Sequence, residues 1–225
     1  MLFRSWGRGI AWGVGLLVGL LSLARTSQAA DFSCAAGDVA CLIAAINQTN
    51  ANGEANTITL EAGTYTLTAV DNNTDGPNGL PSVTSTLTIT GGGAASTVVE
   101  RAANTSDFRF LHVASTGTLT LEGLTLRGGG TNPFSFDGFS GGGLFNNGGQ
   151  VTLSDSLLAS NTVVSGSGGG LFSTQGTVIL CSSTLAGNTG SGSFGVLGAC
   201  PRISVIGSLN PDLARRWRAQ MGHGL

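Results

Sequence analysis

Acidic side chains are the first candidates for chemistry in this sequence of 225 residues, of which only 10% are charged. Cleavage of a glycosidic bond requires two carboxyl groups about 5–9.5 Å apart. A tandem repeat, described below, places Glu122 level with Ser154, and Asp155 level with Ser182. Because no acid stands level with another acid, the spacing favours solvated or turn-bonding carboxylates over a catalytic pair.

Asp137 and Asp155 remain as candidates for a ligand-binding groove. Asp137 lies in a loop of its own at 132–140. Arg127 has no evident acidic partner, and His112 lies in a strand-like segment where an ordinary, partly buried histidine is expected. The sequence therefore assigns no catalytic, cofactor-binding or metal-binding residue, and the interpretation leans away from an enzyme.

One string imitates a hydrolase motif. Residues 138–142 fit the nucleophile pattern G-x-S-x-G, and Ser140, Asp155 and His223 occur in hydrolase order. That pattern requires a sharp turn from a strand into a helix. Glycine-rich turns surround Ser140 instead, and a chain with 37 glycines produces such strings by chance.

Four cysteines in two close pairs indicate disulfides in a chain exported from the cell. Cys34 and Cys41 are seven residues apart, and Cys181 and Cys200 are nineteen apart. Of the three possible connectivities, local pairing is expected. Metal binding is the competing interpretation, but neither of the two histidines is near a cysteine.

The elements that must position these residues come from a repeat. The phrase GGGLFNNGGQVTLSDSLLASNT starts at Gly141, and GGGLFSTQGTVILCSSTLAGNT starts at Gly168, with 13 of 27 positions identical from 141–167 to 168–194. The strand-like segments 86–89, 118–121 and 150–153 extend the series at offsets of 32. A fixed period with alternating apolar residues and no helix is typical of a β-solenoid.

Equivalent positions of successive repeats should then stack along the solenoid axis. We expect an aromatic stack of Phe145 on Phe172, and an asparagine ladder of Asn161 on Asn188. Both pairs have a structural explanation and need no functional one.

The N-terminal segment 1–29 predicts export. Arg4 and Arg8 precede an apolar run at 10–23, and 27–29 form a small-x-small cleavage site. A transmembrane anchor is the alternative, but the run is shorter than the ~20 residues that a bilayer requires. Cleavage leaves seven arginines against twelve acids, and no basic stripe supports nucleic-acid binding.

The domain organisation follows from these segments. We predict a signal peptide at 1–29, an N-terminal cap at 30–56 with an amphipathic helix at 38–48, and a β-helix at 57–210. Residues 211–225 form a basic tail of uncertain structure. No apolar segment follows that could anchor the mature chain in a membrane.

A resemblance to known proteins supports this fold. The run CLIAAINQTNANGEANTITLEAGTYTLT resembles, in its shape, the N-terminal segment of secreted bacterial proteins with CSLREA-type or choice-of-anchor domains. The GGGLFN…VTL…NT repeats are similar to the parallel β-helix of pectin-lyase-like and polymorphic outer-membrane proteins. The resemblance implies an all-β fold: a single-stranded right-handed parallel β-helix of about five rungs with a short N-terminal capping helix.

The resemblance leaves activity open, because this architecture serves lyases, hydrolases, adhesins and passenger domains. The leading hypothesis is a secreted or cell-surface scaffold, extracellular or periplasmic, for adhesion or for binding glycans or cell-envelope components, without catalysis or cofactor. The alternatives are a polysaccharide lyase or glycoside hydrolase with a site beside the 132–140 loop, and a truncated repeat fragment of an adhesin or autotransporter. Oligomeric state, ligand and disulfide connectivity stay open.

Overall fold

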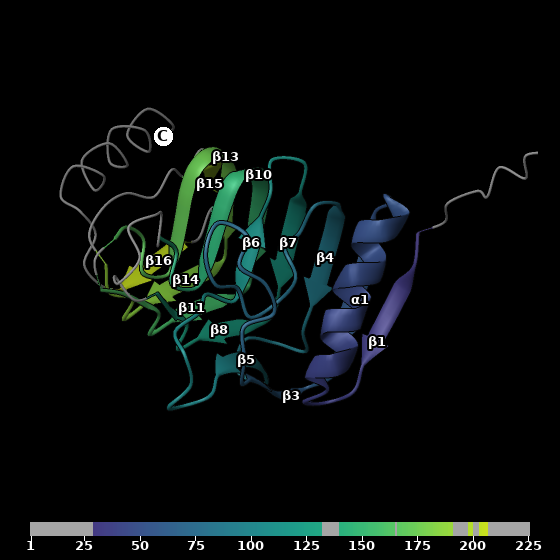
Figure 1. Ribbon diagram of the computed structural model, residues 1–225, viewed down its shortest axis with the longest axis horizontal. Coiled ribbons are helices and arrows are strands. Elements are labelled where there is room, and N and C mark those ends of the chain that lie inside the picture. The colour runs from purple at the N-terminus through teal and green to yellow at the C-terminus, as the bar shows by residue number, and fades with distance from the viewer. Residues whose placement is uncertain (1–28, 132–139, 165, 191–197, 200–202, 207–225) are drawn as a thin grey trace, which may run out of the picture.

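The computed structural model describes residues 29–131, 140–164, 166–190, 198–199 and 203–206. These residues form parallel β-sheets and one helix, so the chain is mostly β (Figure 1). The predicted signal peptide, apart from Ala29, and the predicted basic tail lie outside the described residues, so both assignments stay predictions.

The first sheet runs along the molecule in the order β1-β2-β4-β7-β10-β13-β15, with β6 paired to β10. Its strands are β1 (Asp31–Cys34), β2 (Asn56–Leu60), β4 (Thr86–Thr90), β6 (Leu111–Val113), β7 (Thr118–Glu122), β10 (Leu144–Ser154), β13 (Leu171–Cys181) and β15 (Gly198–Ala199).

The second sheet has the order β3-β5-β8-β11-β14-β16, and β9 pairs with β12 in a third, smaller sheet. The strands are β3 (Gly63–Leu67), β5 (Thr97–Arg101), β8 (Thr125–Arg127), β9 (Gly130–Thr131), β11 (Leu157–Ala159), β12 (Thr162–Val163), β14 (Ser183–Ala186) and β16 (Ile203–Ile206). Successive repeats add one strand to each of the first two sheets, as β4 and β5 do before β7 and β8.

The strand register confirms both offsets of the repeat. Leu87 pairs with Leu119, Leu119 with Val151, and Val151 with Val178. All four side chains are buried, while the alternate position along these strands is occupied by partly exposed residues such as Thr120. Alternation with period two places the apolar set between the sheets and the threonines on the outer surface.

The corners between the sheets also repeat. Gly123, Asp155 and Ser182 occupy equivalent corner positions, and all three have a left-handed backbone with φ of 62°, 48° and 47°. Glycine adopts this conformation without strain, and aspartate tolerates it better than most residues. The corner conformation therefore accounts for an aspartate at position 155. The backbone amide of Asp155 donates to the Cys181 carbonyl.

A helix closes the N-terminal end of the sheets. The predicted helix is confirmed as α1 (Val39–Asn52), which begins after Asp38, whose carboxylate accepts a hydrogen bond from the Cys41 amide at 2.9 Å. Leu42 and Ile46 on its inner side are fully buried. The helix extends beyond the predicted end because the left-handed residue that terminates it is Gly53.

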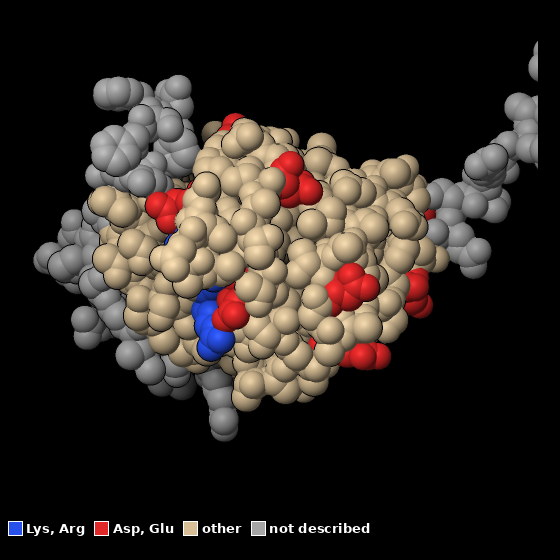
Figure 2. All heavy atoms as spheres, turned by 60° about the horizontal axis from the view of Figure 1, so that its bottom comes forward, with Lys and Arg blue, Asp and Glu red and all other residues tan. Residues whose placement is uncertain are grey.

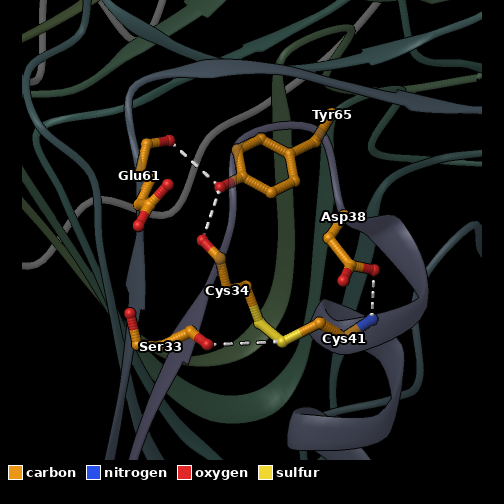
Figure 3. Close-up of a disulfide and its surroundings, with 6 residues drawn as sticks. All are labelled: Ser33, Cys34, Asp38, Cys41, Glu61 and Tyr65. Atoms are coloured by element: carbon orange, nitrogen blue, oxygen red, sulfur yellow. Dashed lines mark hydrogen bonds between the residues drawn. A yellow bond between two sulfur atoms is a disulfide. The ribbon is translucent and has the colours of Figure 1, made fainter.

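The predicted cap also contains a strand that was not predicted from the sequence. This strand, β1, pairs in parallel with β2. The predicted disulfide between Cys34 and Cys41 joins this strand to the helix (Figure 3). Beside it, the hydroxyl of the fully buried Tyr65 donates to the carbonyls of Cys34 and Glu61. Cys200 lies outside the described residues, so its pairing with Cys181 stays a prediction.

The asparagine ladder joins neighbouring repeats through their backbones. Asn161 is fully buried, and its Nδ2 atom donates to Asn188 Oδ1 at 3.0 Å and to the Leu126 carbonyl at 3.2 Å. Its Oδ1 atom accepts from the Gly129 amide at 2.9 Å. One side chain therefore satisfies backbone groups that water cannot reach.

Replacing Asn161 with alanine should lower the free energy of unfolding by about 2–3 kcal/mol, because buried backbone groups lose their partners. The control is Thr162→Ala at the next residue, an exposed position where a change within about 0.5 kcal/mol is expected. Urea unfolding of both variants measures the difference. Equal losses in the two variants would contradict a structural role for the ladder.

Candidate functional site

Three ring side chains lie in a row on the outer side of β6, β10 and β13. Phe145 pairs in register with His112 on one side and with Phe172 on the other. Their neighbours along the strands, such as Leu144, belong to the buried core, so the rings lie on the opposite face. The ring centroids are 5.6 Å apart for His112 and Phe145, and 5.7 Å apart for Phe145 and Phe172. We call this set the ring ladder.

The ring ladder is exposed at one end only. His112 has 1% of its surface exposed and Phe145 has 6%, whereas Phe172 is partly exposed. The stack of the two phenylalanines, with an interplanar angle of 29°, is the one expected from the repeat. A partner in solution would therefore meet Phe172 first.

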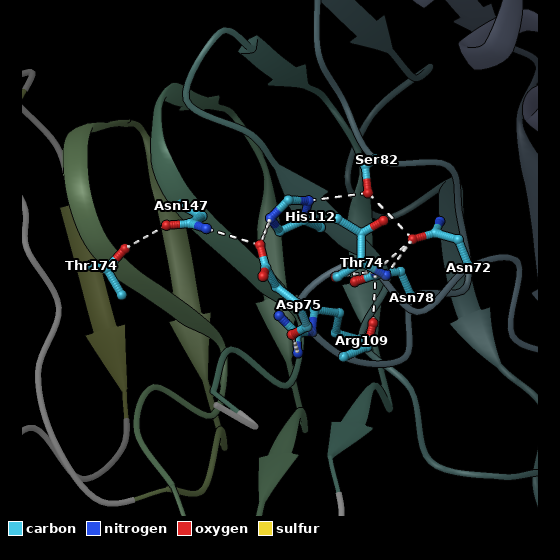
Figure 4. Close-up of polar contacts among 10 residues, drawn as sticks. Asn72, Thr74, Asp75, Asn78, Ser82, Arg109, His112, Asn147 and Thr174 are labelled. Carbon is cyan, nitrogen blue, oxygen red and sulfur yellow. Dashed lines mark hydrogen bonds and ion pairs between the residues drawn. The ribbon is translucent and has the colours of Figure 1, made fainter. Parts of the chain in front are cut away.

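A row of polar side chains begins beside His112 of the ring ladder (Figure 4). Thr174 Oγ1 donates to Asn147 Oδ1 at 3.2 Å, and Asn147 Nδ2 donates to Asp75 Oδ2 at 2.9 Å. The same Asp75 oxygen lies 3.0 Å from Nε2 of His112. We call Asp75, Asn147 and Thr174 the polar row. It brings together side chains that are far apart in the sequence.

Asp75 reaches this row from the irregular segment 71–81. Asn78 is fully buried and holds the segment closed, because its Nδ2 atom donates to Asn72 Oδ1 and to the carbonyls of Thr74 and Gly76. Asp75 itself has a left-handed backbone with φ of 52°. Aspartate tolerates this conformation in turns better than most residues do, as at Asp155.

His112 is a buried histidine with a polar atom at each ring nitrogen. Its Nδ1 atom lies 3.1 Å from Ser82 Oγ, while Nε2 is at ion-pair distance from Asp75 without hydrogen-bond alignment. Burial lowers the pKa of His112 below its ordinary value, Asp75 opposes the shift, and Arg109 adds to it. The imidazole is therefore neutral at pH 7.

Arg109 is a fully buried cation that packs against the Phe145 ring of the ring ladder. Its guanidinium carbon lies 4.9 Å from the centroid of the Phe145 ring, and Nη2 donates to the Asp75 carbonyl at 2.8 Å. The Nε and Nη1 atoms have no hydrogen-bond partner in the described part of the chain. Burial lowers the pKa of Arg109 to about 10, so it keeps its charge at neutral pH. These two contacts of the guanidinium hold the Phe145 ring and the Asp75 backbone in place.

The residues selected from the sequence lie elsewhere. Asp155 is an exposed corner residue whose carboxylate accepts a hydrogen bond from Ser154, and Asp137 lies outside the described residues. The interpretation of Arg127 as unpartnered is wrong, because its Nη2 atom lies 2.6 Å from Glu100 Oε2. The two residues are register partners on β8 and β5. Comparing acids with bases at the offset of the shorter repeat would have found the pair.

The site itself was only partly visible in the sequence. The repeat predicted the two phenylalanines. The pairing of His112 with Phe145 has an offset one longer than that of the strands that follow, where Leu119 pairs with Val151. Asp75 belongs to a segment without repeat. The segment is rich in Asn, Asp and Gly, which predicts a turn. This composition does not predict where the Asp75 side chain lies in the fold.

A metal-binding cluster and a membrane-spanning helix are both absent from the described residues. Among them, no group of three or more His, Cys, Asp or Glu side chains is placed to hold a metal ion. None of the helices in this part of the chain has the length and apolar character needed to cross a membrane.

Comparison with protein-family models, with curated protein sequences and with solved structures finds no match to this chain.

The lowered pKa of His112 predicts a pH dependence of stability. The unfolded chain takes up this proton near pH 6.5, whereas the folded chain resists it, so the free energy of unfolding should decrease as the pH falls below about 6.5. Between about pH 8 and pH 5, urea unfolding should show a decrease that is smaller in His112→Asn. An NMR titration of the wild-type imidazole gives an independent check, and a pKa above the ordinary value would contradict the assignment.

Proposed function

We propose that this protein is an exported scaffold that binds glycans, without catalysis, at the ring ladder and the polar row. The fold we propose for it is a single-stranded right-handed parallel β-helix of about five rungs. The parallel sheets and the repeated register support that fold. The disulfide between Cys34 and Cys41 supports a location outside the cytoplasm, at the cell surface, in the medium or in the periplasm.

The observation that carries the proposal is the alignment of an aromatic row with a polar row. Binding sites for small molecules combine apolar surface with a few placed polar groups. A sugar offers both kinds of surface, since its C–H face packs on a ring while its hydroxyls form hydrogen bonds. Phe172 supplies a partly exposed ring, and Asp75, Asn147 and Thr174 supply carboxylate, amide and hydroxyl groups.

The same geometry favours binding over cleavage. Hydrolysis of a glycosidic bond uses two carboxyl groups. Among the described residues, Asp75 is the single acid with a contact to the ring ladder. His112 and Arg109 are at most 1% exposed, so neither reaches a ligand as an acid, base or electrophile without a rearrangement. The proposal therefore assigns these two residues to support of the site.

Replacing Phe172 with alanine should weaken binding of the preferred oligosaccharide about tenfold, because the exposed ring supplies most of the apolar contact. A glycan array with neutral, acidic and amino oligosaccharides identifies the ligand for the wild type. Isothermal titration calorimetry then compares the dissociation constants of wild type and variant.

The matched control is Ile179→Ala on the same strand, β13. Ile179 is also partly exposed and apolar, but it lies farther along the strand than the ring ladder, in register with Thr152. This control should bind as the wild type does. The proposal fails if no glycan binds, or if both substitutions change the affinity equally.

A further inference from the structure

Unpaired charge on the described surface is acidic. The described residues include ten acids and three arginines. Arg101 lies 3.2 Å from Asp107, Arg127 is paired with Glu100, and Arg109 is buried. Figure 2 shows one face of the molecule, on which acidic side chains outnumber basic ones. No arginine of the described residues is both exposed and free of an acidic partner.

Asp75 brings this negative charge to the glycan site. Its side chain is 47% exposed. The contacts with Asn147 and His112 both use Oδ2, and within the described residues no contact is found for Oδ1. The carboxylate therefore has one oxygen engaged in the polar row and one oxygen available to a partner.

The two basic side chains near Asp75 are too buried to contact a ligand themselves. His112 is neutral at pH 7, and the Arg109 guanidinium is fully buried and bonded to the Asp75 carbonyl. A polyanionic glycan at this site would meet the Asp75 carboxylate without an accessible cation to offset the repulsion. A glycan with free amino groups would instead form a charge-assisted hydrogen bond with Asp75 Oδ1.

We propose that the ligand class is an amine-bearing glycan, of which a glucosamine oligomer is the simplest example. This inference rests on the proposed glycan-binding function. One sugar would pack on Phe172 while the ammonium group of another sugar binds Asp75 Oδ1. Asp75 contacts His112, which is separated from Phe172 by two ring-to-ring steps of 5.6 and 5.7 Å, and this spacing favours an oligomer over a single sugar.

The test compares two probes that differ at one group. Glucosamine hexamer carries a free amine on each sugar, and N-acetylglucosamine hexamer has the same backbone with each amine acetylated and uncharged. Calorimetry at low ionic strength should give tighter binding of the glucosamine hexamer to the wild type, by about tenfold, the value of a charge-assisted hydrogen bond. Added salt should reduce this preference because it screens exposed charges.

Asp75→Asn should abolish the preference for the amine, and Asp155→Asn is the matched control. Asp155 is also an exposed aspartate with a left-handed backbone, φ 48° against 52° for Asp75, so both substitutions remove one charge from similar turns. The control should keep the tenfold preference. If Asp75→Asn does not fold, the salt dependence of the wild-type preference decides the question.

The two proposals fail in different ways. Equal or weaker binding of the glucosamine hexamer relative to the acetylated hexamer overturns the amine-bearing class and leaves glycan binding intact. The same holds if Asp75→Asn, correctly folded, keeps the preference. Absence of binding to both hexamers and to every glycan of the array overturns the proposed function together with this inference.

Discussion

The in-register pairing of parallel strands from successive repeats is the constraint on which this structure depends. A shift by one residue would turn every inward side chain outward, and Leu119 could no longer pack between Leu87 and Val151. The two offsets of the repeat fix this register. The corner residues and the asparagine ladder then satisfy the backbone where the chain leaves a sheet.

The same register builds the candidate site. Because equal positions on neighbouring strands lie side by side, one outward position on three strands becomes the ring ladder, and the residues beside it become part of the polar row. Asp75 comes from outside the repeat and gives the site its charge. Arg109 and Asn78, both fully buried, hold the segment that carries it. The repeated strands therefore form the surface of the site, and the irregular segment 71–81 contributes its charged group, Asp75.

The sequence predicted the parts of the structure that follow from periodicity or close spacing. The repeat predicted the strand register, the apolar stripe predicted α1, and cysteine spacing predicted the disulfide joining it to β1. The strand β1 itself was missed, because its four residues are too few for their polar–apolar alternation to predict a strand. Asp75 was missed for a different reason. A turn segment carries no period, so its side chains could be placed only by the completed fold.

The central claim, that a glycan binds on Phe172 and along the polar row, is tested most directly by a crystal structure of the protein with glucosamine hexamer. The account predicts a sugar ring packed on Phe172 and an amino group within hydrogen-bonding distance of Asp75 Oδ1. A hexamer bound instead on the threonines of β4 and β7, away from Phe172, would contradict it.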